Sequence, residues 1–359
     1  MKYIFQNIKL RKLYIFFLFL AVLNVFFSTG ISHSKTFSIS DVELSAPFKK
    51  NFNKNKIIDE GFIQAFNQLI ISIVQSKDRQ KLKQIKLNQI KGMIETFSIK
   101  EEKFVDEIYY IKLNVTFNKK VIFDLLEKKS IFPSLPVKKK IIFLPIIVDQ
   151  NENQIKMFSD NIIHNLWNLN IKKYDLLNYI LPTEDLEDLN IIKKNIKNLE
   201  EFEFNEIIKK YNLENYIISI FFVRANQTML LSKIKLNNKQ TLKNKKIQNI
   251  DLKKDDEVKK FIEDLKITFE DYWKSQNEIN TSVKLPLTIS VKNSNNIKIY
   301  QLEEKLSNID LIYNFYIYKF DNKNNIYKII FNGTPSKFIE VMKDNNYKFE
   351  TTSKIWVMK

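Results

Sequence analysis

The sequence contains no cysteine, and this absence excludes several classes of protein at once. Without thiols the chain forms no disulfide, has no thiolate nucleophile, cannot build a zinc ribbon or an iron–sulfur site, and offers no cysteine for a lipid anchor. Histidine occurs twice, as His33 near the amino terminus and as His164 in the apolar stretch IIHNLWNL. One imidazole in the body of the chain cannot form a multi-histidine metal site, so we expect His164 to be a partly buried helix residue.

Glycine is almost as scarce as histidine. The four glycines, Gly30, Gly61, Gly92 and Gly333, stand alone, so neither GxGxxG nor GxxxxGK[ST] occurs. Those motifs supply the backbone that cradles nucleotide phosphates. An enzyme built from this chain would depend on Asp, Glu, Ser, Thr, Lys or Tyr. The sequence therefore singles out no catalytic residue, no metal ligand and no cofactor-binding residue, and we expect no cofactor.

A long apolar run lies close to the amino terminus. Four basic residues precede the run at 13–27, and the small-residue site Ser32, His33, Ser34 follows it. A basic region, an apolar region and a small-residue site in this order are typical of a secretory signal peptide. We therefore expect residues 1–34 to be removed and the chain to be exported to the periplasm. The alternative is an inner-membrane anchor through residues 13–30, because a spanning helix needs roughly 17–25 residues.

The chain is strongly basic. Its formal net charge is +17, and this falls to +13 without residues 1–34, which carry four basic residues and no acidic one. The basic residues are spread along the chain rather than clustered, and the abundance of Lys, Asn, Ile and Phe is typical of AT-rich coding. A solvated surface explains this charge better than a dedicated binding patch. Weak, salt-sensitive association with an anionic membrane or polymer remains an alternative.

The pattern of apolar residues divides the rest of the chain into three small modules in series, of α+β or α/β class. We place them at 35–138, 139–280 and 284–359. Prolines and lysines at 133–140 and polar residues at 277–284 mark the joints, where we expect early proteolysis.

The first module has the order strand, helix, strand, strand, helix, which predicts a split βαβ, ferredoxin-like layer. Its first helix carries an apolar stripe that includes Phe66. Asp78 is predicted to cap a second, more basic helix, and Asn118 to cap the helix that ends the module.

The middle module predicts a mixed-sheet α/β domain. The continuous apolar run IIFLPIIV is typical of a buried central strand, in which Pro145 is tolerated only at a bulge or an unpaired position. Ser159 and Thr183 are predicted to cap helices. The lysine-rich stretch 237–251 is predicted to be a loop, and a long helix at about 255–275 closes the module.

The third module predicts a βαββαβ, ferredoxin-like domain in which Thr334 and Pro335 begin the last helix. The RNA-recognition fold shares this order, and Tyr316, Tyr318 and Phe320 invite the comparison. The glycines of its RNA-binding motif are missing, and an exported protein meets little RNA. We therefore expect no nucleic-acid partner, and we attribute the three aromatic residues to ordinary strand packing.

Pairs of carboxylates are the one arrangement of catalytic side chains that these absences do not exclude. Asp41 with Glu43, and Glu184 with Glu187, are candidates for general acid and base chemistry, which needs two carboxyl groups about 5–9.5 Å apart. The acids at 184–188 follow Thr183, and a hydroxyl cap with acids in the first helical turn explains them without a metal ion.

Several stretches resemble a known family. The segments GFIQAFNQLIISI, EIYYIKLNVTFNKKVIFDLLEKKSI, KKIIFLPIIVDQ and IIFNGTPSKFIEVMKDNNYKF resemble the exported alphaproteobacterial proteins of domain-of-unknown-function family 2066. The order of elements in the middle module is also similar to the amino-terminal domain of TolB and to CsgG-like envelope proteins. The family has no assigned activity, so the resemblance implies export and the fold but no site residue.

Two functions remain. We expect a non-catalytic periplasmic interaction or assembly protein of the bacterial cell envelope, with an envelope protein as its partner. The alternative is a carboxylate-dependent hydrolase that acts on envelope polymer.

Overall fold

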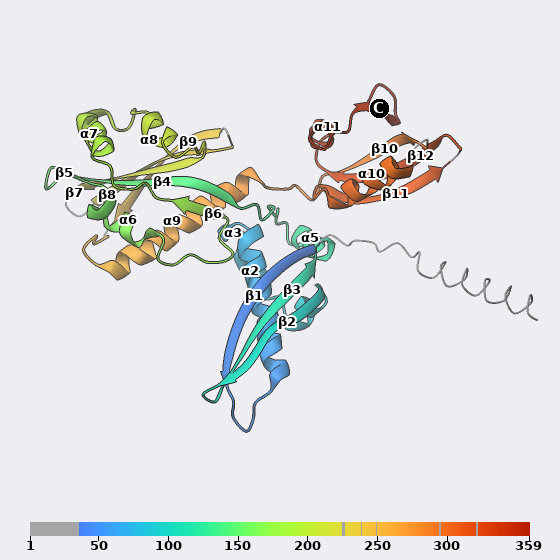
Figure 1. Ribbon diagram of the computed structural model, residues 1–359, viewed down its shortest axis with the longest axis horizontal. Coiled ribbons are helices and arrows are strands. Elements are labelled where there is room, and N and C mark those ends of the chain that lie inside the picture. Colours follow the sequence, from blue (N-terminus) through green and yellow to red (C-terminus); the bar gives the residue numbers. More distant parts are fainter. Residues whose placement is uncertain (1–35, 225–226, 238, 249, 294–295, 321) are drawn as a thin grey trace, which may run out of the picture. The chain divides into compact units, whose positions relative to one another are not determined.

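The computed structural model describes residues 36–359 apart from 225–226, 238, 249, 294–295 and 321. It is a mixed α+β structure in which three sheets of three, six and five strands follow one another along the chain (Figure 1). The coarse fold class predicted from the sequence is therefore confirmed. The predicted signal peptide at 1–34 and the alternative anchor at 13–30 lie outside the described residues. Within the described part of the chain, no helix combines the length and the apolar character that a membrane crossing requires.

The first sheet contains β1 (Thr36–Pro47), β2 (Ile94–Val105) and β3 (Ile108–Asn118) in the order β1-β3-β2. Both pairs are antiparallel, so β1 and β2 run parallel to each other with β3 between them. The chain passes from β1 to β2 through α2 (Lys54–Ile73) and the short elements after it. This is the predicted split βαβ arrangement. A complete ferredoxin-like sheet has a fourth strand beside β1, and the described residues of this sheet form three.

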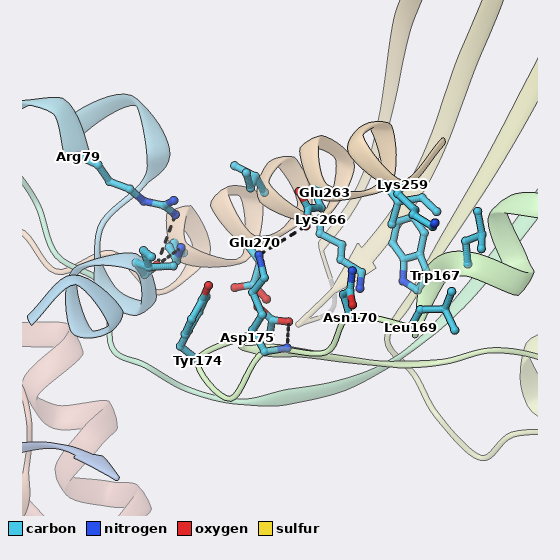
Figure 2. Close-up of a pocket in the computed structure, with 16 residues that line it drawn as sticks. Arg79, Trp167, Leu169, Asn170, Tyr174, Asp175, Lys259, Glu263, Lys266 and Glu270 are labelled. Atoms are coloured by element: carbon cyan, nitrogen blue, oxygen red, sulfur yellow. Dashed lines mark hydrogen bonds and ion pairs between the residues drawn. The ribbon is translucent and has the colours of Figure 1, made fainter. Parts of the chain in front are cut away.

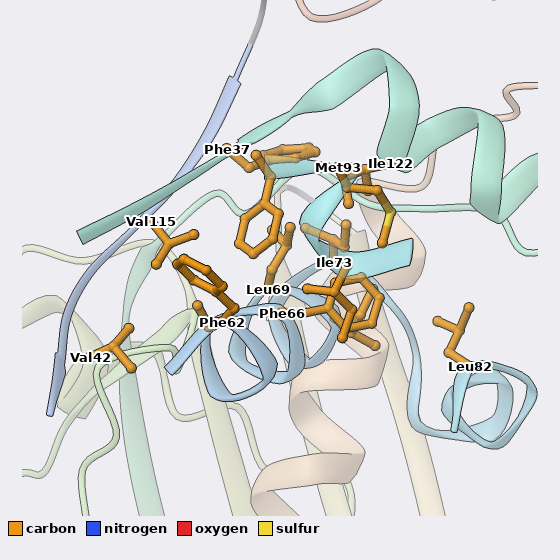
Figure 3. Close-up of a cluster of buried hydrophobic side chains, with 14 of the residues drawn as sticks. Phe37, Val42, Phe62, Phe66, Leu69, Ile73, Leu82, Met93, Val115 and Ile122 are labelled. Carbon is orange, nitrogen blue, oxygen red and sulfur yellow. The ribbon is translucent and has the colours of Figure 1, made fainter. Parts of the chain in front are cut away.

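The core of this module lies between α2 and the sheet. One face of α2 is buried through Phe62, Phe66, Leu69 and Ile73, at the spacing expected of an amphipathic helix (Figure 3). Every second residue of β3 is buried against it. Helix and sheet approach closely at Gly61, where an added Cβ would lie 2.5 Å from Cδ1 of Leu113.

The basic segment after α2 does not form the single helix that we predicted from Asp78. It forms α3 (Ser76–Arg79), a 3-10 turn at Gln80–Leu82 and α4 (Leu87–Lys91), and the residue that precedes α3 is Gln75. Leu82 and Ile90 of this segment lie in the core, and Ile85 and Leu87 pack against it. One continuous helix would place Leu87 about 140° around the axis from Leu82, so the interruption lets both residues face the core. After β3, α5 (Lys119–Lys128) begins as predicted, with Oδ1 of Asn118 accepting the backbone N–H of Val121.

The middle sheet has the order β5-β4-β7-β8-β9, and β6 also pairs with β4. β4 runs parallel to β6 and β7, and the other pairs are antiparallel, so the predicted mixed sheet is confirmed. Its strands are β4 (Lys139–Asp149), β5 (Gln154–Lys156), β6 (Leu177–Ile180), β7 (Tyr216–Arg224), β8 (Gln227–Leu236) and β9 (Lys239–Gln248).

Helices cover both faces of this sheet and give it two hydrophobic cores. One core includes residues of α6 (Ile162–Trp167) and of the long helix α9 (Asp255–Gln276), as predicted for 255–275. The other core includes residues of α7 (Leu186–Lys194) and α8 (Asn205–Lys209). A sheet covered on both faces explains why β4 is buried from Ile141 to Val148.

Pro145 lies opposite Ser219 of β7 on one side of β4, and on the other side of β4 it lies at a stretch that no described strand pairs with, as expected of a buried proline. β6 pairs with β4 only up to Ile142, and β5 pairs only from Ile147. In the gap, the side-chain amide of the fully buried Asn161 donates to the carbonyl oxygen of Pro145 at 3.0 Å. Asn161 is also the N-cap of α6, so the prediction that Ser159 caps this helix is wrong. Ser159 instead lies in the 3-10 turn Phe158–Asp160.

The lysine-rich stretch predicted as a loop at 237–251 contains β9, which pairs with β8 from Leu236 and Lys239 to Gln227 and Gln248. That prediction is wrong because an edge strand needs neighbours on one side only and tolerates charged side chains along its length. Its apolar residues are too few to mark a strand by alternation.

The third sheet has the order β11-β12-β10-β14-β13, with α10 (Asn296–Asn308) and α11 (Pro335–Asp344) on one face. Thr334 caps α11 and Pro335 begins it, as predicted. The strands are β10 (Lys284–Lys292), β11 (Ile312–Phe320), β12 (Asn324–Asn332), β13 (Phe349–Glu350) and β14 (Trp356–Met358).

The last strand departs from the predicted βαββαβ pattern. In that pattern the strand after the second helix runs antiparallel to the first strand. Here β14 runs parallel to β10, because the two-residue strand β13 adds one more reversal of the chain before it. The βαββα part of the prediction agrees with the structure, and its final strand does not.

The two predicted joints, at 133–140 and 277–284, pair with each other. Ser134 and Glu278 form an antiparallel bridge, and the backbone N–H of Ile279 donates to the carbonyl oxygen of Pro133 at 2.7 Å. Ser134 also donates its N–H to the carbonyl oxygen of Ile73 at 2.8 Å.

Candidate functional site

The third sheet has one covered face and one open face. Ile289, Tyr327 and Ile329 point toward α10 and α11 and are buried with Leu302 and Phe338. Because side chains alternate along a strand, their neighbours in the chain point to the opposite face.

The outer strand β11 carries exposed aromatic and aliphatic side chains along its edge, with Tyr316 on the open face and Ile317, opposite the buried Tyr327, on the face that the helices cover. Tyr316 lies opposite Lys328 of β12, whose neighbours Tyr327 and Ile329 are buried, so Tyr316 belongs to the open face. The exposed fractions are 47% for Tyr316, 47% for Ile317, 59% for Tyr318 and 76% for Phe320. Strand packing therefore does not explain these aromatic residues, and that expectation is wrong. We call Tyr316, Ile317, Tyr318 and Phe320 the β11 surface.

The β11 surface lies on an edge of the sheet. No described strand pairs with the outer side of β11, whereas its inner side pairs with β12 from Ile312 to Phe320. The beginning of the strand is held elsewhere, since the hydroxyl of Tyr313 donates to Asp124 of α5 at 3.2 Å. The second half of β11 is thus the part that remains accessible.

One aromatic ring of this surface contacts a charged side chain of the neighbouring strand. The ammonium group of Lys328 lies 4.0 Å from the ring centroid of Tyr318, a cation–π contact. Beneath the open face, the hydroxyl of the buried Tyr327 donates to Glu303 of α10 at 2.6 Å. Burial, together with that carboxylate, raises the pKa of Tyr327, so this hydroxyl stays protonated. Lys328 thus contacts the ring of Tyr318, and Tyr327 joins the sheet to α10 beneath it.

The first predicted carboxylate pair consists of surface ion pairs. Asp41 accepts from Lys100 at 2.7 Å, and Glu43 pairs with Lys112 at 3.2 Å and with Lys173 at 3.3 Å. Hydrogen bonds from these lysines hold the pKa of each carboxyl group below its ordinary value. A lowered pKa suits a permanently ionised group and not a general acid.

The second predicted pair belongs to a helix start. Asp185, and not Thr183 as predicted, is the N-cap of α7, accepting the backbone N–H groups of Glu187 and Asp188. Lys210 joins Asp185 at 2.8 Å and the fully buried Asp188 at 2.6 Å. Glu184, the other member of the pair, accepts from the hydroxyl of Ser159 at 3.2 Å. In the described part of the chain, no three Asp, Glu or His side chains gather in a way that could hold a metal ion.

His164 is a half-buried residue of α6, as predicted, with Nε2 lying 3.0 Å from the carbonyl oxygen of Pro182.

The sequence analysis missed the buried charges of α9. Glu270 accepts the backbone N–H groups of Leu176 and Leu177, both at 2.8 Å, and its burial raises the pKa of the carboxyl group. One turn later, burial lowers the pKa of Lys274 to about 8. Each of these polar residues follows a large buried aromatic residue, Phe269 or Trp273. A charged residue at the border of an apolar stripe can be buried, and this position could have indicated it. Most charged residues in such positions are exposed to solvent, however.

No protein-family model matches the chain, and no curated protein matches it.

Proposed function

We propose that this protein is a non-catalytic interaction protein of the bacterial cell envelope, exported to the periplasm, which binds a partner protein through the β11 surface. The observation that carries this proposal is the outer edge of β11, which no described strand pairs with and which carries four exposed apolar or aromatic residues. An edge strand offers a row of free N–H and C=O groups, which an extended segment of another protein can pair with. Export rests on the basic and apolar pattern of residues 1–34.

The chemistry of the surface favours a protein partner. Tyrosine and phenylalanine provide large contact areas at interfaces and lose little conformational entropy when they are ordered. A single-stranded nucleic acid would need aromatic residues on the central strands of the sheet, as in the RNA-recognition fold. The outward residues of the central strands include no aromatic side chain, whereas the exposed aromatic residues lie on the edge strand; these outward residues are Pro286, Thr288 and Ser290 on β10 and Ile326, Lys328 and Ile330 on β12.

The same proposal includes the resemblance to the exported family of unknown function. It also includes the similarity of the middle module to the TolB amino-terminal domain and to CsgG-like proteins. The grouping of the first and third modules with ferredoxin-like folds is part of this proposal as well. The split βαβ of the first sheet and the βαββα order of the third support that grouping, and the orientation of β14 is its main departure.

Site-specific photo-crosslinking tests the proposed surface. A photoreactive phenylalanine analogue replaces Tyr318 in one strain and Tyr300 in another, and both are irradiated in living cells. Tyr300 is the matched control, because it is a 69% exposed tyrosine on α10 of the same module. We expect a discrete crosslinked partner from position 318 and not from position 300.

The partner identified in this way is then purified for binding measurements. The double change Tyr316→Ser and Tyr318→Ser should weaken its affinity at least tenfold, and Tyr300→Ser should leave it unchanged. Equal crosslinking at both positions, or equal affinity of all variants, would contradict a role for the β11 surface.

A further inference from the structure

A cavity of about 460 Å³ lies between α9, the end of α6 and the segment that follows α6 (Figure 2). This volume falls within the range of small-molecule sites, roughly 300–1,000 Å³. Its apolar wall comes from Leu166, Trp167, Leu169 and Ile262. The charged residues that line it are Arg79, Lys172, Asp175, Lys259, Glu263, Lys266, Glu270 and Lys274.

Most of these charges already have partners of opposite sign or backbone partners. Lys172 lies 3.7 Å from Glu263, and Lys259 lies 3.4 Å from Asp256. Glu270 is occupied by two backbone N–H groups. Asp175 accepts the backbone N–H of Lys172 at 2.9 Å. Asp175, Glu263 and Glu270 thus have other hydrogen-bond or ion-pair partners among the described residues.

Lys266 is the exception. Its ammonium group is half-buried and lies 5.6 Å from the ring centroid of Trp167 and 5.9 Å from that of Tyr179, and Figure 2 shows it beside Trp167 and Asn170. Among the residues that the structure describes, it has neither an ion pair nor a hydrogen bond. Burial lowers the pKa of this lysine and outweighs the opposing effect of the charges on Asp175, Glu263 and Glu270.

The aromatic cluster under Lys266 also contains hydrogen-bond donors that lack an acceptor among the described residues. Trp167 stacks on Phe143 with ring centroids 3.7 Å apart, and both are buried. The indole N–H of Trp167 and the hydroxyl of Tyr179 are buried without a hydrogen-bond partner in the described part of the chain. Such groups are uncommon in folded proteins because desolvation without a hydrogen bond is costly. In the described part of the chain, the ammonium group of Lys266 in the cavity lining and two buried donors in the aromatic cluster beneath it thus lack an acceptor.

We propose that this cavity binds a small organic anion, whose carboxylate or phosphate group pairs with Lys266 and whose apolar part lies against Leu166, Leu169 and Ile262. An anion supplies the acceptor that Lys266 lacks, and a charge-assisted hydrogen bond in a partly desolvated cavity is stronger than one at the surface. The apolar wall selects against fully hydrated inorganic ions. This site is separate from the β11 surface and does not depend on its function.

Isothermal titration calorimetry of the full mature chain tests the site with four probes: benzoate, phenyl phosphate, inorganic phosphate and the neutral benzyl alcohol. We expect benzoate or phenyl phosphate to bind at least tenfold more tightly than either inorganic phosphate or benzyl alcohol. The comparison of benzoate with phenyl phosphate decides between the two anionic groups. Failure of both organic anions to bind, or equal binding of benzyl alcohol, overturns the proposal.

Variants then locate the site. Lys266→Met keeps the aliphatic stem and removes the charge, so it should lower the affinity for the anion at least tenfold. Lys266→Arg keeps the charge and should keep the affinity. Lys243→Met is the matched control, because Lys243 lies 4.6 Å from the ring centroid of Tyr272 outside the cavity lining. Undiminished binding by Lys266→Met overturns the proposal.

Nuclear magnetic resonance of the unaltered protein provides the test if Lys266→Met does not fold. The indole N–H resonance of Trp167 is assigned by comparison with Trp167→Phe, and it should shift when the anion is added. A resonance that does not move overturns the proposal.

Discussion

The ammonium group of Lys274 donates a hydrogen bond to the carbonyl oxygen of Ile71, 2.6 Å away and 203 positions earlier in the chain. Ile71 lies in the last turn of α2, where backbone carbonyls lack donors within the helix. Arg79 donates to the same oxygen at 3.4 Å. Two cations therefore meet the partial negative charge of one helix end, and one of them comes from α9.

Burial of Lys274 makes stability depend on pH in a defined window. Its pKa falls from the ordinary 10.5 to about 8 in the folded chain, so between these values the unfolded chain holds the proton and the folded chain has released it. Stability from this group should therefore rise as the pH goes from 8 to 10.5, by at most about 3 kcal/mol. Urea unfolding of the natural chain and of Lys274→Met, at several pH values, isolates this contribution as the difference between them. A difference that stays flat or falls with pH would show that the pKa of Lys274 is not lowered in the folded chain.

Asn161 should be among the most sensitive polar residues. Its side chain caps α6 and satisfies the carbonyl oxygens of Pro145 and Lys156. Replacement by alanine removes a cap worth about 1 kcal/mol and leaves a buried carbonyl without a donor, which costs about 1–3 kcal/mol more. We expect Asn161→Ala to lower the free energy of unfolding by about 2–4 kcal/mol. Asn165→Ala, on the exposed side of the same helix, should cost less than about 1 kcal/mol, and equal losses would contradict the assignment.

In the first module, replacing a buried residue of α2 should cost far more stability than replacing an exposed residue of the same helix. Phe66 of α2 is 2% exposed, and its ring centroid lies 6.2 Å from that of Phe117. Phe66→Ala should cost about 3–5 kcal/mol by opening a cavity, and Phe66→Asp should unfold the module. Ile63→Ala on the solvent side of α2 should cost far less. Thermal unfolding followed by circular dichroism compares the three variants, and a small effect at Phe66 would mean that this core is loosely packed.

The lysine-rich strand β9 should resist protease better than its composition implies. Its backbone pairs with β8 along its whole length, and cleavage requires an extended, unpaired segment. Brief trypsin treatment should therefore cut after Lys49 or Lys50, in the exposed turn before α2, earlier than after Lys243, Lys245 or Lys246. Mass spectrometry of the first fragments identifies the order, and initial cleavage within β9 would favour the loop that the sequence suggested.

Amide replacements separate the interaction protein from the hydrolase. Asp41→Asn, Glu43→Gln, Glu184→Gln and Glu187→Gln each remove one ionisable group and keep its shape. We expect stability changes of no more than about 1 kcal/mol and full complementation of any deletion phenotype. One variant that folds normally and fails to complement would support catalysis by carboxylates.

Local patterns determined how much of this structure could be predicted from the sequence. Alternation in β3 and the apolar stripe of α2 are strong signals, because each strand or helix buries one face against the other. Capping was predictable at Asn118 and Thr334 but failed at Ser159, since Asn161 also serves a neighbouring strand that the local sequence does not reveal. The exposure of Tyr316 and Tyr318 depends on which strand lies at the edge of the sheet. Strand order is a tertiary property, and aromatic residues favour strands in either position.

The bridge between Ser134 and Glu278 holds together the two ends of the segment that forms the middle sheet. Paired strands lie about 5 Å apart, so the two ends of the intervening segment meet at one point. A segment with adjoining ends has the geometry of a domain inserted into a surface turn of another protein. A short turn in place of the intervening segment would therefore connect the first module to the third directly.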